Sequence, residues 1–247
     1  MDRPVKLLGI AGNDVLQGGS GNDTLDGREG NDTLKGASGD DTLIGWSGAD
    51  TMIGGMGNDN YLIENIGDIV NESPNAGIDI VSSKITYSLP TNVENLTLTG
   101  SSAINGTGNS LANVIIGNFA VNQLNGGSGN DILDGGNGNN VLTGGTGNNI
   151  FKFTTRGHTD TITDYSVAND TIQLENAAFK SLTTNGTLAA NQFIVSTKAL
   201  DANDFIIYNN ATVALLYDPD GSGAGAAAQF ATISIGLGLT NADIVVI

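Results

Sequence analysis

Aspartate recurs at every ninth residue between residues 9 and 62, with glycines at fixed distances from it. The stretch divides into six nonapeptides, GIAGNDVLQ, GGSGNDTLD, GREGNDTLK, GASGDDTLI, GWSGADTMI and GGMGNDNYL, with Gly at positions one and four and Asp at position six. Glycine lets the backbone bend tightly at positive φ, so carbonyl oxygens can converge beside the carboxylate. Such a set of hard oxygen ligands suits Ca²⁺, which takes roughly six to eight, better than Mg²⁺, which demands a small octahedral site. The pattern predicts a row of calcium sites.

The elements that must position these aspartates are short turns and strands. The half-repeat G-x-x-G-x-D is turn-forming, and the residues after it form a minimal strand. Position eight is always large and mostly apolar: Leu16, Leu25, Leu34, Leu43, Met52 and Tyr61. We therefore expect a repeat architecture in which each position-eight side chain packs inward against its neighbours in a thin core.

The composition restricts the function. The chain has 247 residues, 36 Gly, 5% aromatic residues and a net charge of −17, which argues against binding nucleic acid or an anionic membrane. A salt-adapted acidic surface would explain the charge but not its nine-residue spacing. With no Cys, a single His158 and no H-E-x-x-H or G-x-S-x-G motif, the sequence predicts no enzyme and no thiolate metal site. No stretch has the length of a transmembrane helix, and residues 1–8 do not form a Sec signal peptide.

The consensus GGxGxDxUx resembles the calcium-binding RTX (repeats-in-toxin) nonapeptide. The resemblance implies an all-β fold, a parallel β-roll solenoid in which two nonapeptides make one turn, here in two blocks with a C-terminal β-rich cap. It also implies that each ion lies between stacked turns. One turn supplies the carbonyls of positions two and four with its Asp, and the next supplies the carbonyls of positions one and three with its Asp.

Carried onto this sequence, the resemblance implies four complete calcium sites in the first block. On one edge the ligand sets are Ile10, Gly12, Asp14, Gly27, Glu29 and Asp32, and then Arg28, Gly30, Asp32, Gly45, Ser47 and Asp50. On the opposite edge they are Gly19, Gly21, Asp23, Gly36, Ser38 and Asp41, and then Ala37, Gly39, Asp41, Gly54, Met56 and Asp59. Position two is not Gly in several of these repeats. Because this position would contribute only its backbone carbonyl, we expect little loss of calcium affinity.

After a spacer at residues 63–107, which we interpret as longer rungs of the same solenoid, a second block of nonapeptides spans residues 108–152. Its position-six residues are Asn113, Asn122, Asp131, Asn140 and Asn149. Asn keeps an oxygen but loses the charge that sets calcium affinity. We expect no tight site beside Asn122 and Asn140, where stacked Asn side chains can form a hydrogen-bonded ladder. A weak site is expected at Gly127, Gly129 and Asp131.

Residues 1–8 are predicted to be a tail and residues 153–247 a cap, in which Asp160, Asp164 and Asp170 are candidate ligands. The segment LYDPDGSGAG, followed by QFATI, resembles the C-terminal region of serralysin-like RTX proteins. That resemblance implies an uncleaved type I secretion signal, export by a type I ABC exporter, and a location outside or on the surface of a Gram-negative-type bacterium.

The leading functional hypothesis is a secreted, non-catalytic calcium-binding protein with a structural role. Without cation, the acidic turns repel and the thin core cannot offset chain entropy, so we expect a disordered apo state and a calcium-bound β-rich state. Open solenoid ends favour self-association into a surface layer or filament. Only eight residues precede the first repeat, so we expect no catalytic module before it. The alternatives are the calcium-binding and secretion module of a larger secreted hydrolase or adhesin, and a carbohydrate-binding module.

Overall fold

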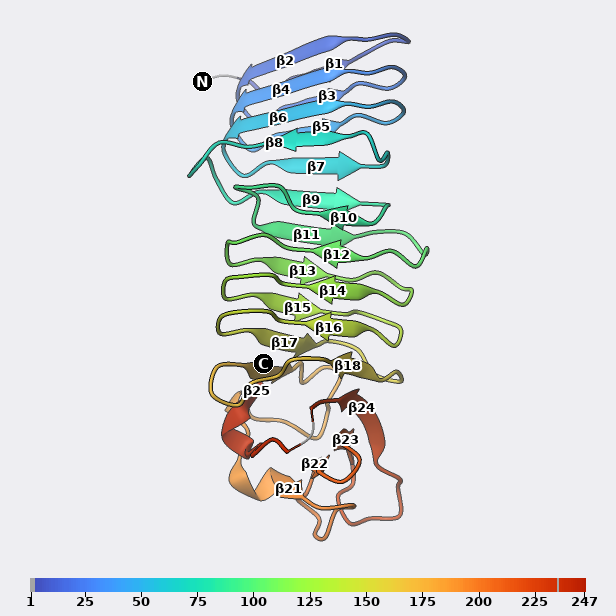
Figure 1. The fold of residues 1–247 in the computed structure, drawn as a ribbon, viewed down its shortest axis with the longest axis vertical. Helices are drawn as coiled ribbons and strands as arrows, with labels where there is room; N and C mark the ends of the chain where they lie inside the picture. Colours follow the sequence, from blue (N-terminus) through green and yellow to red (C-terminus); the bar gives the residue numbers. More distant parts are fainter. Residues whose placement is uncertain (1–2, 235) are drawn as a thin grey trace. The chain divides into compact units, whose positions relative to one another are not determined.

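The protein is described by a computed structural model covering residues 3–234 and 236–247, and its regular structure is nearly all β-strand (Figure 1). Residues 1 and 2 of the predicted tail and residue 235 of the predicted cap lie outside the described residues. The chain forms two compact units, Met1–Ile115 and Ile116–Ile247. No helix among the described residues is long and apolar enough to cross a membrane.

The first unit stacks short parallel strands in two main rows (Figure 1). One row pairs, in order, β1 (Lys6–Leu8), β3 (Thr24–Asp26), β5 (Thr42–Ile44), β7 (Asn60–Ile63), β9 (Ile80–Ser83) and β11 (Asn95–Leu98). The other pairs β2 (Val15–Ser20), β4 (Thr33–Ser38), β6 (Thr51–Met56) and β8 (Ile69–Asn71), while β10 (Tyr87–Ser88) pairs with β12 (Gly106–Thr107). β13 (Val114–Ile116) spans the boundary of the units.

The strand register shows how the repeats form turns. Leu25 lies opposite Leu43, and Leu16 lies opposite Leu34, so hydrogen-bonded partners are two nonapeptides apart. Alternate nonapeptides therefore belong to alternate rows, and two of them make one turn. This confirms the predicted parallel β-solenoid.

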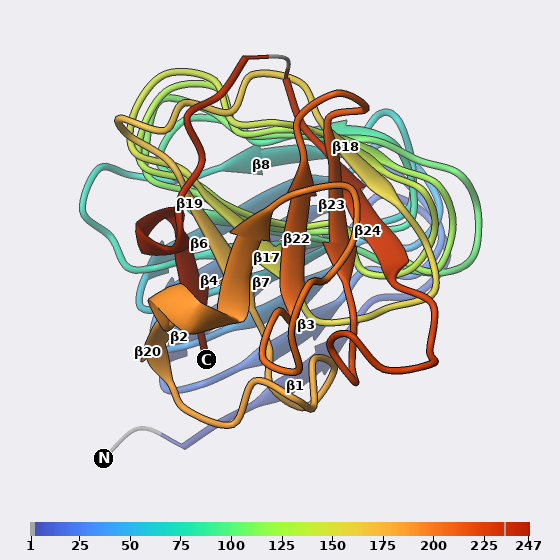
Figure 2. The ribbon, with the colours of Figure 1, turned by 90° about the horizontal axis from the view of Figure 1, so that it is seen from below.

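The second unit continues with parallel strands and ends in a mixed sheet. One sheet orders β15 (Ile132–Asp134), β17 (Ile150–Phe153), β19 (Thr171–Leu174), β25 (Ile244–Val246) and, antiparallel to it, β20 (Gly186–Thr187). The other orders β14 (Gln123–Asn125), β16 (Val141–Thr143), β18 (Asp160–Ile162), β24 (Ala228–Thr232), β23 (Ala214–Tyr217), β22 (Ile206–Asn209) and β21 (Phe193–Val195). Figure 2 shows β22, β23 and β24 side by side. The unit also contains two short 3₁₀ helices, η1 (Ala190–Gln192) and η2 (Asn241–Asp243).

The core is a stack of position-eight side chains, as the sequence predicts. In the first block Leu25, Leu34, Leu43, Met52 and Tyr61 have no exposed surface. In the second block the buried position-eight residues are Ile115, Leu124, Leu133, Leu142 and Phe151. Leu16 of the first repeat is only half-buried, and each later repeat of the two blocks contributes one large buried side chain. The core is thus continuous but thin, and its stability depends on stacking between turns.

Truncating one of these leucines tests the stacked core. Leu43→Ala should lower the free energy of unfolding by about 2–5 kcal/mol, because Leu43 is completely buried and its loss leaves a cavity. Leu8→Ala is the matched control, since Leu8 is 47% exposed and should lose much less. Urea unfolding in calcium measures both variants. Equal destabilisation by the two would contradict the stacked-core description.

Candidate metal centre

The position-six aspartates form a ladder along each row of turns. The backbone N–H of each Asp donates to Oδ1 of the Asp two repeats later: Asp23 to Asp41 (2.7 Å), Asp32 to Asp50 (2.8 Å) and Asp41 to Asp59 (2.7 Å). The ladders continue past the nonapeptides, from Asp50 to Asp68 (3.3 Å) and from Asp59 to Asp79 (2.8 Å). The backbone therefore uses one oxygen of each carboxylate and fixes the direction of the other.

The second carboxylate oxygens are buried and unpaired. Oδ2 has no hydrogen-bond partner in Asp23, Asp32, Asp41, Asp50, Asp59 and Asp79, and these residues are at most 2% exposed. Among the described residues, the ion pairs formed by Lys84 with Glu64 and by His158 with Asp160 do not reach them. An ionised carboxylate buried without a partner is strongly unfavourable, by several kcal/mol. A bound cation would neutralise these two rows of oxygens, and without one the burial favours their protonated form.

Glycine at position one leaves the space that the Asp carboxylate occupies. A Cβ on Gly36 would overlap Oδ2 of Asp41 and lie 2.8 Å from the carbonyl oxygen of Gly54. A Cβ on Gly18 would likewise overlap Oδ2 of Asp23 and lie 2.9 Å from the carbonyl oxygen of Gly36. Carboxylate and carbonyl oxygens thus converge where a side chain is missing. This donor set consists of hard oxygens and fits calcium.

The structure brings together the two turns of each predicted ligand set. The N–H of each position-four Gly donates to the position-three carbonyl two repeats later: Gly12 to Glu29 (2.8 Å), Gly21 to Ser38 (2.9 Å), Gly30 to Ser47 (2.9 Å) and Gly39 to Met56 (2.7 Å). In the opposite row, Gly19 lies in register with Ala37 across β2 and β4. A carbonyl oxygen has two lone pairs, so one hydrogen bond leaves one lone pair for an ion.

Two of the predicted ligands differ from this arrangement. The carbonyl oxygen of Arg28 accepts both the N–H of Ser47 (2.9 Å) and its hydroxyl (3.2 Å), which occupies both lone pairs. In the first turn, the N–H of Ile10 donates to Oδ2 of Asp14 (2.8 Å), the oxygen that is unpaired in the later turns. Arg28 and Ala37 occupy position two with φ of 76° and 87°, whereas Ile10 does not have a positive φ. The two predicted sets that contain Ile10 and Arg28 therefore each depart from this arrangement.

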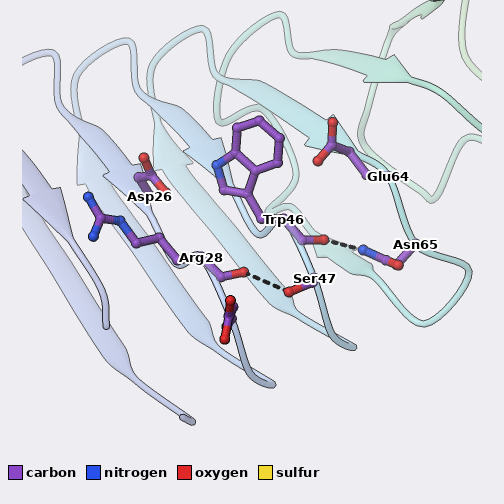
Figure 3. Close-up of a pocket in the computed structure, with 7 residues that line it drawn as sticks. Asp26, Arg28, Trp46, Ser47, Glu64 and Asn65 are labelled. Atoms are coloured by element: carbon purple, nitrogen blue, oxygen red, sulfur yellow. Dashed lines mark hydrogen bonds between the residues drawn. The ribbon is translucent and has the colours of Figure 1, made fainter. Parts of the chain in front are cut away.

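Position two faces outward. Arg28 and Trp46 line an open hollow of about 580 Å³, together with Asp26, Glu29, Ser47, Glu64 and Asn65 (Figure 3). Trp46 is 45% exposed, and its carbonyl accepts a hydrogen bond from Asn65 Nδ2. Large side chains are tolerated at this position because they extend over the surface while the backbone stays in the turn.

In the second block, amide groups take over the hydrogen bonds of the ladder. The N–H of Asn122 donates to Oδ1 of Asn140 (2.9 Å), so this ladder bond joins a backbone group to a side chain. Asn140 Nδ2 in turn donates to the carbonyls of Asn137 (3.1 Å) and Gly138 (3.2 Å) and to Oδ1 of Asp160 (3.0 Å). The amide nitrogen thus supplies a hydrogen-bond donor to turn carbonyls, and the expectation of no tight calcium site here stays a prediction.

The predicted second-block site centres on Asp131, which is buried. Its N–H donates to Oδ1 of Asn149 (3.0 Å), and its Oδ2 occupies the space beside Gly126. The carbonyl of Gly127 accepts the N–H of Thr146 (3.0 Å), and the N–H of Gly129 donates to the carbonyl of Thr146 (2.9 Å). The stacking matches the first block, but the partner turn offers an amide in place of a carboxylate.

Two acidic residues that the sequence analysis left out lie beside the last nonapeptide. Ligand oxygens of Asp59, Glu72 and Asp79 all lie within 4.8 Å of one another. Glu72 stands eighteen residues after Gly54, and Asp79 twenty residues after Asp59. Continuing the count of turns through the spacer would have found both. Burial, reinforced by the neighbouring carboxylates, raises the pKa of Asp59 to about 7 and that of Asp79 to about 6.

The sequence matches one family model and a short stretch of a known enzyme. Residues 8–43, 26–61, 107–142 and 116–151 match the family of the RTX calcium-binding nonapeptide repeat (four copies). The chain carries RTX calcium-binding repeats. It is 50% identical over 46 residues to the endo-1,3-1,4-beta-glycanase EglC of Rhizobium meliloti (strain 1021), which covers 19% of the chain and 10% of that protein. Compared with the extracellular lipase LipA of Serratia marcescens, it has 20% identity and a TM-score of 0.27, covering 98% of this chain and 40% of that one.

The RTX ladder predicts opposite pH dependences without and with calcium. Burial raises the folded-state pKa of Asp59, Asp79 and Asp160 to about 7, 6 and 7, well above their ordinary value. Without metal, the folded chain therefore binds protons that the unfolded chain releases, and its stability is lost as pH rises through about 6 to 7. In EGTA, the folded fraction should increase from about pH 8 to about pH 5.

In millimolar calcium the trend should reverse, because the ligands must lose their protons to bind the metal. Far-UV circular dichroism across this pH range measures both conditions. The same pH dependence in EGTA and in calcium would contradict the prediction.

Neighbouring aspartates provide a test of the ladder. Asp41→Asn keeps an oxygen for the N–H of Asp23 but removes a charge from two predicted sites, so the calcium midpoint should rise about tenfold or more. Asp40→Asn is the control, because Asp40 is exposed and other repeats carry Asn at this position. An amide oxygen can also accept the N–H of Asn58, as Asp40 does at 2.8 Å. Calorimetric titration compares the two variants, and equal midpoints would rule out the ladder as the calcium site.

Proposed function

We propose that this chain is a secreted protein whose first RTX block is ordered by calcium outside the cell. The observation that carries the proposal is the set of buried, unpaired Oδ2 atoms that follows the nonapeptide period. Calcium between the turns would neutralise these carboxylates and join each turn to the next. We place the ions in the four ligand sets of residues 9–62.

The thin core makes folding depend on the metal. Each repeat buries one large apolar side chain, which does not offset the ordering of nine residues and the burial of a bare carboxylate. A site exposed to calcium at a hundredfold excess over its Kd adds about 2.7 kcal/mol of stability. Several such sites together would decide whether the first block folds. Calcium-poor cytoplasm and calcium-rich surroundings would then give an unfolded and a folded chain, respectively.

Export would use the C-terminal region, whose resemblance to serralysin-like proteins includes β23 and β24. We infer that a type I ABC exporter recognises this region and releases the chain outside the cell or at its surface. A chain that stays unfolded until it meets calcium would suit passage through such an exporter.

For the role after secretion, we propose assembly of copies into a layer or filament. β1 and β2 are each at the end of a strand order and pair on one side only within the described residues. Leu8, Ile10 and Val15 near this edge are 47%, 70% and 72% exposed. Unpaired strand edges with apolar side chains favour pairing with another chain.

The alternative is a module of a larger secreted protein. The chain spans 10% of the length of the glycanase and 40% of that of the lipase with which it was compared. The hollow around Trp46 favours a carbohydrate contact in such a module, because an exposed aromatic ring beside Arg28 and Glu64 offers both stacking and hydrogen bonding to a sugar.

A calcium titration of the full chain tests the proposed function. Far-UV circular dichroism should change from a disordered spectrum in EGTA to a β-rich spectrum in millimolar calcium, and equimolar magnesium should not replace calcium. The absence of any change between EGTA and calcium would refute the proposal.

Light scattering on the same samples tests the assembly role separately. We expect the particle mass to increase beyond that of the monomer once the chain is folded in calcium. A folded chain that remains monomeric at saturating calcium would refute assembly and leave calcium-dependent folding intact.

A further inference from the structure

Glu72 lies just beyond the last nonapeptide, directly after β8, and its carboxylate is held in a fixed position. It accepts the N–H of Gly55 through Oε1 (3.3 Å) and Oε2 (3.4 Å), and it accepts the hydroxyl of Tyr61. The oxygen of Tyr61 in turn accepts the N–H of Gly54 (2.8 Å). A side-chain carboxylate therefore stands at the first position of the next turn, where the repeat pattern would place a glycine.

Three carboxylates meet at this point, and neither ion pair found among the described residues includes any of them. Asp59 and Asp79 are completely buried, and Oδ2 of each has no hydrogen-bond partner. Their Oδ1 atoms are already used in the ladder, which leaves the unpaired oxygens beside Glu72. The burial of two unpaired carboxylate oxygens beside a third carboxylate favours a bound cation, which would neutralise all three.

The second block contains a turn of the same design that lacks this cluster. Asp164 accepts the N–H groups of Gly144 (2.8 Å) and Gly145 (2.7 Å), as Glu72 accepts the N–H of Gly55. The N–H of Asn149 donates to Oδ1 of Asp170 (2.9 Å), as that of Asp59 donates to Asp79. Beside Gly144, however, the space holds Asn149 Nδ2, where Gly54 faces the Oδ2 of Asp59. An amide donor, Asn149 Nδ2, therefore lies in the turn capped by Asp164, whereas unpaired carboxylate oxygens lie in the turn capped by Glu72.

We propose that Asp59, Glu72 and Asp79 bind a further calcium ion, with three carboxylates in place of the carbonyls used between the nonapeptides. The inference rests on calcium binding by the RTX repeats and adds a site that the nine-residue motif does not contain. Three negative ligands make this site strongly charged, and ligand charge raises calcium affinity. The ion would join the last nonapeptide to the longer rung that follows, so the Gly-rich block would end in a closed turn rather than an open one.

Crystals of the full chain grown in calcium and soaked in terbium provide the direct test. We expect an anomalous difference peak within ligand distance of Asp59, Glu72 and Asp79. Peaks in the Gly-rich turns without a peak here would overturn this inference and leave the proposed function standing. No peak at either place would overturn the proposed function as well.

A pair of glutamate variants gives the same answer in solution. Glu72→Gln keeps an oxygen for Gly55 and Tyr61 but removes the charge, and calorimetry should show one calcium ion fewer per chain than in the wild type. Glu64→Gln is the control, since Glu64 pairs with Lys84 and should leave the number of bound ions unchanged. An unchanged number in folded Glu72→Gln would show that no ion depends on the Glu72 carboxylate, which overturns the proposal. If Glu72→Gln does not fold, the wild-type crystal decides.

Discussion

The arrangement of the first unit depends on carboxylates that are buried with one oxygen unpaired. From Asp23 to Asp59, each position-six Asp accepts a backbone N–H of the preceding turn through Oδ1, and its unpaired Oδ2 occupies the space left by the position-one glycine. The nonapeptide thus combines three features in one short segment: a turn-forming backbone, a large side chain for the core, and a buried carboxylate that must be neutralised. A cation between turns would neutralise the carboxylate and hold the turns and the stacked core together.

The two blocks form the same turns and ladder hydrogen bonds with different side chains at position six. Where Asp41 presents an unpaired oxygen, Asn140 presents an amide nitrogen that donates to the carbonyls of Asn137 and Gly138. The ladder hydrogen bond to Oδ1 is retained in both, so the strand register is unchanged by the substitution. The exchange of one oxygen for one nitrogen therefore gives the turn at Asn140 a hydrogen-bond donor that the turn at Asp41 lacks.

Much of this could be predicted from the sequence because the period is strict. The nine-residue spacing predicts the buried position-eight residues, and the resemblance to RTX repeats supplies the two-repeat turn that brings Gly12 beside Glu29. Details outside the period could not be predicted. The hydroxyl of Ser47 reaches the carbonyl of Arg28, and Asp79 follows Asp59 by twenty residues rather than eighteen.

The strand pairing at the end of the second unit could not be predicted from the sequence either. β24 returns to pair with β18, which places Asp160 opposite Ala231, and β25 returns to β19, which places Ile172 opposite Ile244. Such pairings join segments about seventy residues apart and leave no local pattern. The β-rich character of the cap can be read from its alternating strands, but their partners are set by packing against the last turns of the roll.

Amide hydrogen exchange measured by mass spectrometry, in calcium and in EGTA, tests the central claim most directly. If unpaired carboxylates make the first block dependent on a cation, peptides from residues 9–62 should lose their protection in EGTA, while peptides from residues 117–151 should retain more of theirs. Equal protection of residues 9–62 with and without calcium would contradict the account.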